Sequence, residues 1–77
     1  MRNIFEKDIN GIRYTFYRIP MTGEIVYNIS YRQDNESEVF IMRRVEGRWN
    51  VKEPHLDEFV YNSAPSLEDA INENETS

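Results

Sequence analysis

The sequence predicts an α+β fold: an antiparallel meander of four to five strands, with a C-terminal helix, kinked or split at Pro65, packed on one face. Apolar residues alternate with polar ones up to about Lys52 and recur at helical spacing after it. Residues 1–52 have a net charge of +2 and residues 53–77 a net charge of −7, which together give the −5 of the chain. We expect one domain over 1–77, with the meander in 1–52, a helical segment in 53–74 and a frayed tail at 75–77.

The first hairpin is predicted by Asn10-Gly11, which sits between two alternating segments. Both residues tolerate the positive φ that a two-residue type I′ turn requires. In that register Ile9 faces Ile12, Asp8 faces Arg13 and Phe5 faces Phe16, and each pair is chemically compatible. Whether this first segment joins the sheet is left open, hence four to five strands.

The second and third strands are expected over 12–19 and 24–32, because both segments alternate. Pro20 to Gly23 should break the chain between them, since proline cannot donate to a ladder and glycine permits a reversal. A fourth strand is expected over 38–45 and a short fifth over 48–51, separated by Glu46-Gly47. The fourth is apolar on both sides, and we place Phe40 and Met42 inward because burying Arg43 would be costly.

This alternation predicts two faces of the sheet. The core face is expected to hold Ile12, Tyr14, Phe16, Ile25, Tyr27, Ile29, Tyr31, Phe40, Met42, Trp49 and Val51. The opposite face is expected to hold four arginines and no acid, with Arg13, Thr15, Tyr17, Val26, Asn28, Ser30, Arg32, Val39, Ile41, Arg43, Arg48 and Asn50.

The helical end carries an apolar stripe of seven residues: Leu56, Phe59, Val60, Ala64, Leu67, Ala70 and Ile71. Proline is well tolerated only in the first turn of a helix, so two helices at about 54–61 and 65–74 are expected, with one kinked helix as the alternative. The apolar surface that such a stripe can cover is the aromatic face of the sheet.

Candidate chemistry is sparse. The single histidine, His55, has Glu53 and Asp57 nearby, but a metal site needs three or four convergent ligands. The chain has no cysteine, and its three glycines are explained by turns, which leaves no phosphate-binding loop. We therefore expect no catalytic, cofactor or metal residues and no enzyme activity.

The opposite face is the candidate interaction surface. It mixes cations with rings and apolar side chains, and the residues singled out are Arg13, Tyr17, Val26, Arg32, Ile41, Arg43 and Arg48. The leading interpretation is a protein partner or self-association as a homodimer. The alternative is single-stranded nucleic acid, gripped by arginines at phosphates and by aromatic stacking. An ordinary solvated face is the competing structural explanation.

The composition favours a soluble cytoplasmic protein. There is no apolar run of the roughly 18 residues that a membrane span needs, and no signal peptide is apparent. The absence of cysteine fits a reducing compartment.

Three short motifs carry a resemblance: Ile9-Asn10-Gly11-Ile12, Gly47-Arg48-Trp49 and the run from Ala64 to Ile71. With these the chain resembles a group of small uncharacterised bacterial proteins, which implies the meander-plus-helix fold and no particular activity. The order of four strands and then a helix is also similar to the PC4-like transcriptional coactivator and whirly domains. That similarity implies dimeric binding of single-stranded DNA.

Overall fold

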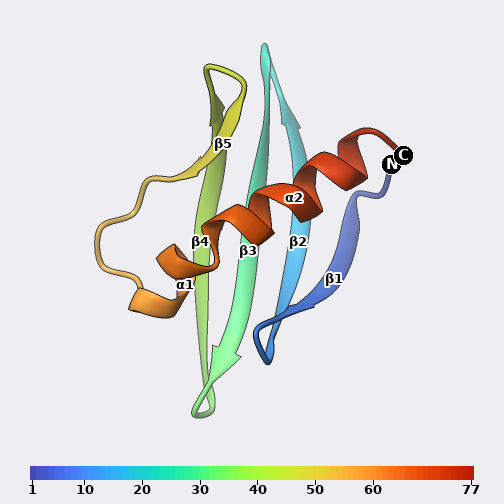
Figure 1. Ribbon diagram of the computed structural model, residues 1–77. Helices are drawn as coiled ribbons and strands as arrows, with labels where there is room; N and C mark the ends of the chain where they lie inside the picture. The colour runs from blue at the N-terminus through green and yellow to red at the C-terminus, as the bar shows by residue number, and fades with distance from the viewer.

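The computed structural model describes residues 1–77 and shows the expected α+β meander. Five antiparallel strands follow one another in the order β1-β2-β3-β4-β5, and a helix packs against one side of the curled sheet (Figure 1). The elements are β1 Ile4–Ile9, β2 Ile12–Met21, β3 Glu24–Gln33, β4 Glu36–Val45, β5 Arg48–Val51, α1 Glu58–Asn62 and α2 Ala64–Glu75.

The first hairpin has the expected register. Asn10 and Gly11 both have positive φ, and Ile9 pairs with Ile12. Phe5 pairs with Phe16, and their rings stack with centroids 4.5 Å apart. The first segment is therefore a full member of the sheet.

Strand β2 runs through Pro20 to Met21, two residues beyond the expected end at Ile19. The Arg18 N–H points toward β1, where it donates to the Asn3 carbonyl. Because alternate residues of a strand direct their N–H groups to the same side, the missing donor of Pro20 also falls on the β1 side. Pairing of β1 with β2 does not reach that far, so Pro20 costs the ladder no bond.

Strand β4 turns Phe40 and Met42 inward, as expected, and both are fully buried. Trp49 of β5 is buried on the same side. The predicted aromatic face is thus the core face, with Ile12, Ile25 and Val51 partly buried at its margins.

The helical end consists of two helices, so the split alternative is correct and the single kinked helix is not. Ser63 lies between α1 and α2, and Pro65 occupies the first turn of α2, where its missing N–H is harmless. Helix α2 crosses the aromatic face diagonally (Figure 1), burying Leu67, Ala70 and Ile71. The Trp49 indole N–H donates to Asn72 at 3.2 Å.

Helix α2 ends at Glu75, one residue beyond the helical segment expected over 53–74, and the fraying expected at 75–77 stays a prediction. The Glu75 carboxylate accepts from the Arg18 guanidinium at 2.7 Å and from the Tyr27 hydroxyl. The N-terminal amine of Met1 donates to the Ser77 carbonyl at 3.2 Å, so the two termini lie together (Figure 1). These contacts fasten the last turn of α2 to the sheet.

Neither α1 nor α2 has the length and apolar character of a membrane-spanning helix.

Candidate interaction surface on the outer sheet face

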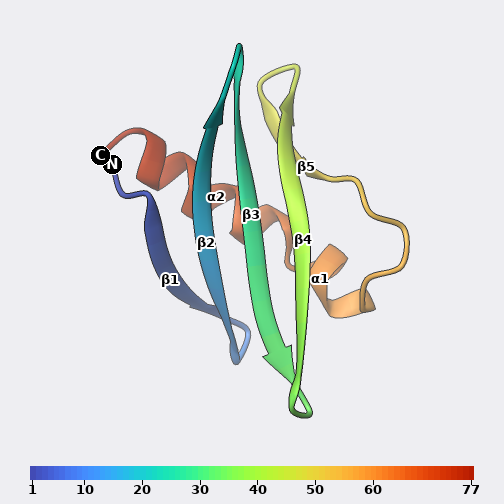
Figure 2. The ribbon, with the colours of Figure 1, turned by 180° about the vertical axis from the view of Figure 1, so that it is seen from behind.

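The outer face is the side of the sheet opposite α2, and it lies bare when the molecule is seen from behind (Figure 2). Alternation and pairing assign to this face residues such as Ile4, Tyr17, Asn28 and Ile41, which follow one another across β1 to β4. Apart from Met1, every exposed large hydrophobic side chain of the chain belongs to it. These are Ile4, Tyr17, Ile19, Met21, Val39 and Val45.

The outer face is uneven. On β3 the outward side chains are recessed: Val26 is only 3% exposed, and Asn28 and Ser30 are partly buried. We call these three residues the trough. On either side, Tyr17 of β2 is 41% exposed and Val39 of β4 is 51% exposed. A shallow hollow of about 730 Å³ opens here, lined in part by Ile4, Tyr17, Ile19, Asn28, Ser30 and Val39.

The arginines of this face are matched by carboxylates, contrary to the expectation of a face without acids. Arg13 forms a bidentate pair with Asp8 at 3.0 and 3.2 Å and lies 3.8 Å from Glu6. The hydrogen bonds from Arg13 hold the pKa of Asp8 below its ordinary value. Arg43 pairs with Glu24 at 3.3 Å. The acids come from β1 and from the start of β3, which the predicted face did not include.

The two remaining arginines differ from each other. Arg32 is exposed and forms no ion pair. Arg48 does not belong to a free outer surface, because its side chain reaches around β5, an edge strand, to Glu68 of α2 at 2.8 Å. Its guanidinium therefore serves the contact between sheet and helix.

Val26 was expected to be an exposed apolar anchor, but it is buried. Its neighbours across the adjacent strands are Ile19 and Arg43, and Arg43 is tied to Glu24 on the same face of β3. Of the predicted apolar members, Tyr17 is exposed and Ile41 is partly buried. The structure thus brings Tyr17, Ile41 and the Arg43 pair onto one surface, with Arg13 and Arg32 toward the opposite end of the strands.

Sequence reasoning missed four exposed apolar residues of this face: Ile4, Ile19, Met21 and Val45. The signal was present for three of them. Ile19 lies within the expected strand 12–19 and continues the alternation of Arg13, Thr15 and Tyr17, whereas Met21 was excluded because Pro20 was interpreted as the end of the strand. Ile4 follows from the correct hairpin register, which pairs it with Tyr17.

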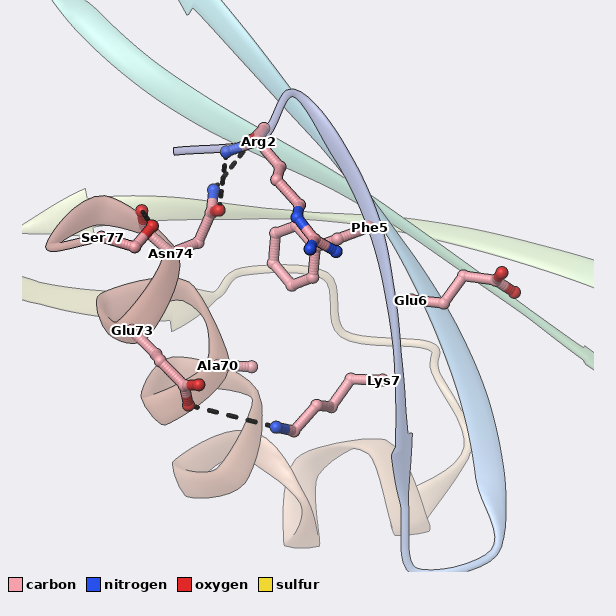
Figure 3. Close-up of a pocket in the computed structure, with 8 residues that line it drawn as sticks. All are labelled: Arg2, Phe5, Glu6, Lys7, Ala70, Glu73, Asn74 and Ser77. Carbon is pink, nitrogen blue, oxygen red and sulfur yellow. Dashed lines mark hydrogen bonds and ion pairs between the residues drawn. The ribbon is translucent and has the colours of Figure 1, made fainter.

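A second hollow lies between β1 and α2 (Figure 3). It is lined mainly by polar groups, with Phe5 and Ala70 as its apolar members. Lys7 and Glu73 face each other across it at 4.0 Å, and the Asn74 side chain bonds both backbone groups of Arg2. Its charged and amide groups are thus used to hold α2 against β1.

The carboxylates near His55 are engaged elsewhere. Glu53 accepts from the Ile41 backbone N–H at 3.2 Å, and Asp57 accepts from the Tyr31 hydroxyl at 2.9 Å. Burial, together with this Asp57 contact, raises the pKa of Tyr31. No three His, Cys, Asp or Glu side chains converge as metal ligands would.

Comparison of the chain with protein-family models, with curated proteins and with solved structures finds no match.

Proposed function

We propose that this chain is a non-enzymatic domain of the cytoplasm that acts by binding a protein surface with its outer sheet face. The carrying observation is that six of the seven exposed large hydrophobic side chains gather on that face. Scattered single exposures are normal for a folded protein, whereas a contiguous apolar patch is typical of an interaction site.

The charges of the outer face support a protein partner. The middle of the face, around Tyr17, Asn28 and Ile41, carries no Asp, Glu, Lys or Arg. The flanking charges of Arg13 and Arg43 are already paired within the chain. A partner covering the middle of the face and these two pairs, and leaving Arg32 at the margin in water, would not bury an uncompensated charge, which is the main penalty of burying ionic groups.

Single-stranded nucleic acid is the alternative for the same face, and the ion pairs weigh against it. Phosphate binding depends on cations that release counterions, and of the outer arginines only Arg32 has no carboxylate partner. An oligonucleotide mobility shift at low salt, weakening steeply as salt is added, would revive this alternative.

Photo-crosslinking in the cells that naturally produce the chain tests the proposal. A photoreactive phenylalanine analogue replaces Tyr17 in one variant and Asp69, exposed on α2, in a matched variant. We expect a discrete crosslinked product from the Tyr17 position and none from the Asp69 position. Mass spectrometry of the product identifies the captured protein.

Equal yields of crosslinked product at the Tyr17 and Asp69 positions would refute the proposal. It would also be refuted if neither the Tyr17 probe nor a second probe at Val39 gave a product. Both substituted residues are exposed, so the variants are expected to fold, and the fluorescence of buried Trp49 provides the check.

A further inference from the structure

We infer that the open edge of β1 accepts an extended peptide of another protein as an additional antiparallel strand. This inference goes beyond the proposed function, because the site is an edge of the sheet and not its outer face. The arguments are the unpaired backbone groups of β1, the hollow between β1 and α2, and the acidic side chains beside them.

Three residues of β1 have backbone groups without a partner. The Arg18 N–H donates to the Asn3 carbonyl at 2.8 Å, so the odd-numbered residues of β1 bond β2 and the even-numbered residues face away from it. Ile4, Glu6 and Asp8 therefore direct their N–H and C=O groups to the open edge, where no other part of the chain bonds them. An added strand can form a ladder with these groups.

The opposite edge of the sheet is largely blocked by side chains. The Glu53 carboxylate accepts from the Ile41 backbone N–H at 3.2 Å. The Glu68 carboxylate accepts from the Trp49 backbone N–H at 2.9 Å. Only the end of β4 next to the β3–β4 hairpin stays open there. Such blocking protects an edge strand from pairing with other chains, and β1 lacks it.

The open edge runs beside the hollow between β1 and α2 (Figure 3). The Asn74 side chain bonds both backbone groups of Arg2, at 2.8 and 2.9 Å, and so closes the N-terminal end of the edge. The hollow measures about 300 Å³ and has Phe5 and Ala70 as its apolar members. The residue of the added strand opposite Phe5 points to the α2 side, into this hollow, so an apolar residue is expected there.

The charges beside the edge favour a basic peptide. Glu6 and Asp8 lie on the outer face and share one cation, Arg13, which leaves one negative charge. Peptide residues opposite these two acids point to the same face, so lysine or arginine is favoured at both positions. From N- to C-terminus the expected segment is therefore basic, any residue, basic, apolar, apolar, and spans from Asp8 to Ile4. The −5 charge of the chain attracts such a segment.

A second copy of β1 does not suit this edge. Antiparallel pairing of two copies centred on Glu6 sets glutamate directly opposite glutamate, and pairing centred on Lys7 sets lysine opposite lysine. Like charges directly opposite each other destabilise a strand pair. Pairing centred on Phe5 leaves only two bonded residues in each copy, because Asn74 already holds the backbone groups of Arg2.

Fluorescence anisotropy with a labelled synthetic peptide, Thr-Arg-Thr-Lys-Phe-Val-Thr, tests the inference. We expect saturable binding to the wild-type chain with a dissociation constant below about 500 µM, since so small an interface binds weakly. Methylation of the lysine backbone nitrogen removes the N–H that donates to the Glu6 carbonyl and should weaken binding about tenfold or more. Methylation of the phenylalanine nitrogen is the matched control, because that N–H points away from β1, and should change the affinity less than about threefold.

Three protein variants separate backbone pairing from charge. Glu6→Gln keeps the edge N–H and should weaken binding about threefold through the lost charge. Glu6→Pro also removes that N–H, without loss to the β1–β2 ladder, and should weaken binding about tenfold or more. Ser37→Pro removes an edge N–H of β4 and should leave binding unchanged. The fluorescence of buried Trp49 checks that each variant is folded.

No saturable binding up to about 1 mM peptide, an equal or greater loss from the phenylalanine methylation, or equal binding by Glu6→Pro and wild type would each overturn the inference. Self-association of the purified chain that Glu6→Pro abolishes would make a second copy the occupant and would overturn it too. The Tyr17 photo-probe reports on the outer face alone, so failure of the proposed function and failure of this inference are distinguishable.

Discussion

Glu68 should be the carboxylate whose removal destabilises the protein most. Its side chain is 9% exposed and accepts three hydrogen bonds: two from the Arg48 guanidinium at 2.8 Å and one from the Trp49 backbone N–H at 2.9 Å. These bonds lower its pKa from 4.5 to about 2. The contact joins α2 to the edge strand β5, so losing it loosens the helix from the sheet.

The magnitude follows from that pKa. Lowering the pKa of Glu68 from 4.5 to about 2 corresponds to roughly 3.5 kcal/mol. Arg48 is 72% exposed, so solvent screening reduces this to about 2 kcal/mol. Glu68→Gln keeps an acceptor for the Trp49 N–H and should therefore cost about 2 kcal/mol at neutral pH. Glu68→Ala also leaves the buried Trp49 N–H without an acceptor, so its free energy of unfolding should be about 1 kcal/mol lower still.

The pH dependence has a definite sign. Because the folded-state pKa lies below the unfolded value of 4.5, the stabilisation is fully present above pH 4.5 and is lost as the pH falls toward 2. The free energy of unfolding of wild type should therefore converge on that of Glu68→Gln within this window. At neutral pH the two should differ in melting temperature by roughly 8–16 °C.

Urea unfolding followed by Trp49 fluorescence measures this, since the single tryptophan is buried beside Glu68. Asp69→Asn is the matched control, because it removes one charge from the adjacent exposed position of α2 and should change the stability by less than about 0.5 kcal/mol. The reasoning is refuted if Glu68→Gln and Asp69→Asn are equally stable. It is also refuted if the cost of Glu68→Gln is the same at pH 7 and pH 2.5.

Three further substitutions test other parts of the fold. Burial and the Glu75 carboxylate raise the pKa of Tyr27 to about 12, so wild type should lose stability from pH 10 upward. Tyr27→Phe should lower the free energy of unfolding by about 1–2 kcal/mol at pH 7, because the hydrogen bonds to Glu75 and Asn74 are lost. Urea melts should show this difference between wild type and variant shrinking toward pH 12, and a difference that does not change with pH contradicts the reasoning. Gly11→Ala should lower the free energy of unfolding by about 1–2 kcal/mol, because φ at Gly11 is +83°, where a residue with a Cβ is strained. No atom crowds the added Cβ, so this cost comes from the backbone conformation alone, and no change in thermal unfolding would show that the turn relaxes. Leu67→Ala should cost about 2–5 kcal/mol by circular dichroism melts, since Leu67 is fully buried, and a loss below 1 kcal/mol would mean that α2 is not held by this core.

The parts of the fold that sequence predicts well are those fixed by local periodicity. The two-residue turn at Asn10-Gly11 determines which residues of β1 and β2 face the same side of the sheet. The alternation of apolar and polar residues then extends this assignment through β3 to Phe40 and Met42 of β4. The split of the helical segment follows from Pro65, whose ring suits only a first turn. These features require no knowledge of contacts distant in sequence.

The candidate site was less predictable because its charges are balanced across strands. The pair of Arg13 and Asp8 was visible in the hairpin register, but the face was assembled without β1. The partnership of Arg48 with Glu68 joins residues twenty positions apart and depends on the rotation of α2 about its axis, which periodicity does not specify. Alternation alone also does not show how recessed β3 is.

The meeting of the two chain ends has a consequence for engineering. Met1 and Ser77 are hydrogen-bonded to each other at one corner of the molecule, so a brief peptide could join them. The polypeptide could then be reopened at the exposed β3–β4 hairpin tip, Asp34-Asn35, giving a circular permutant with the same packing. Because the two ends are adjacent, this domain could be inserted into a surface loop of a host protein with little change in the distance between the two host residues that it joins.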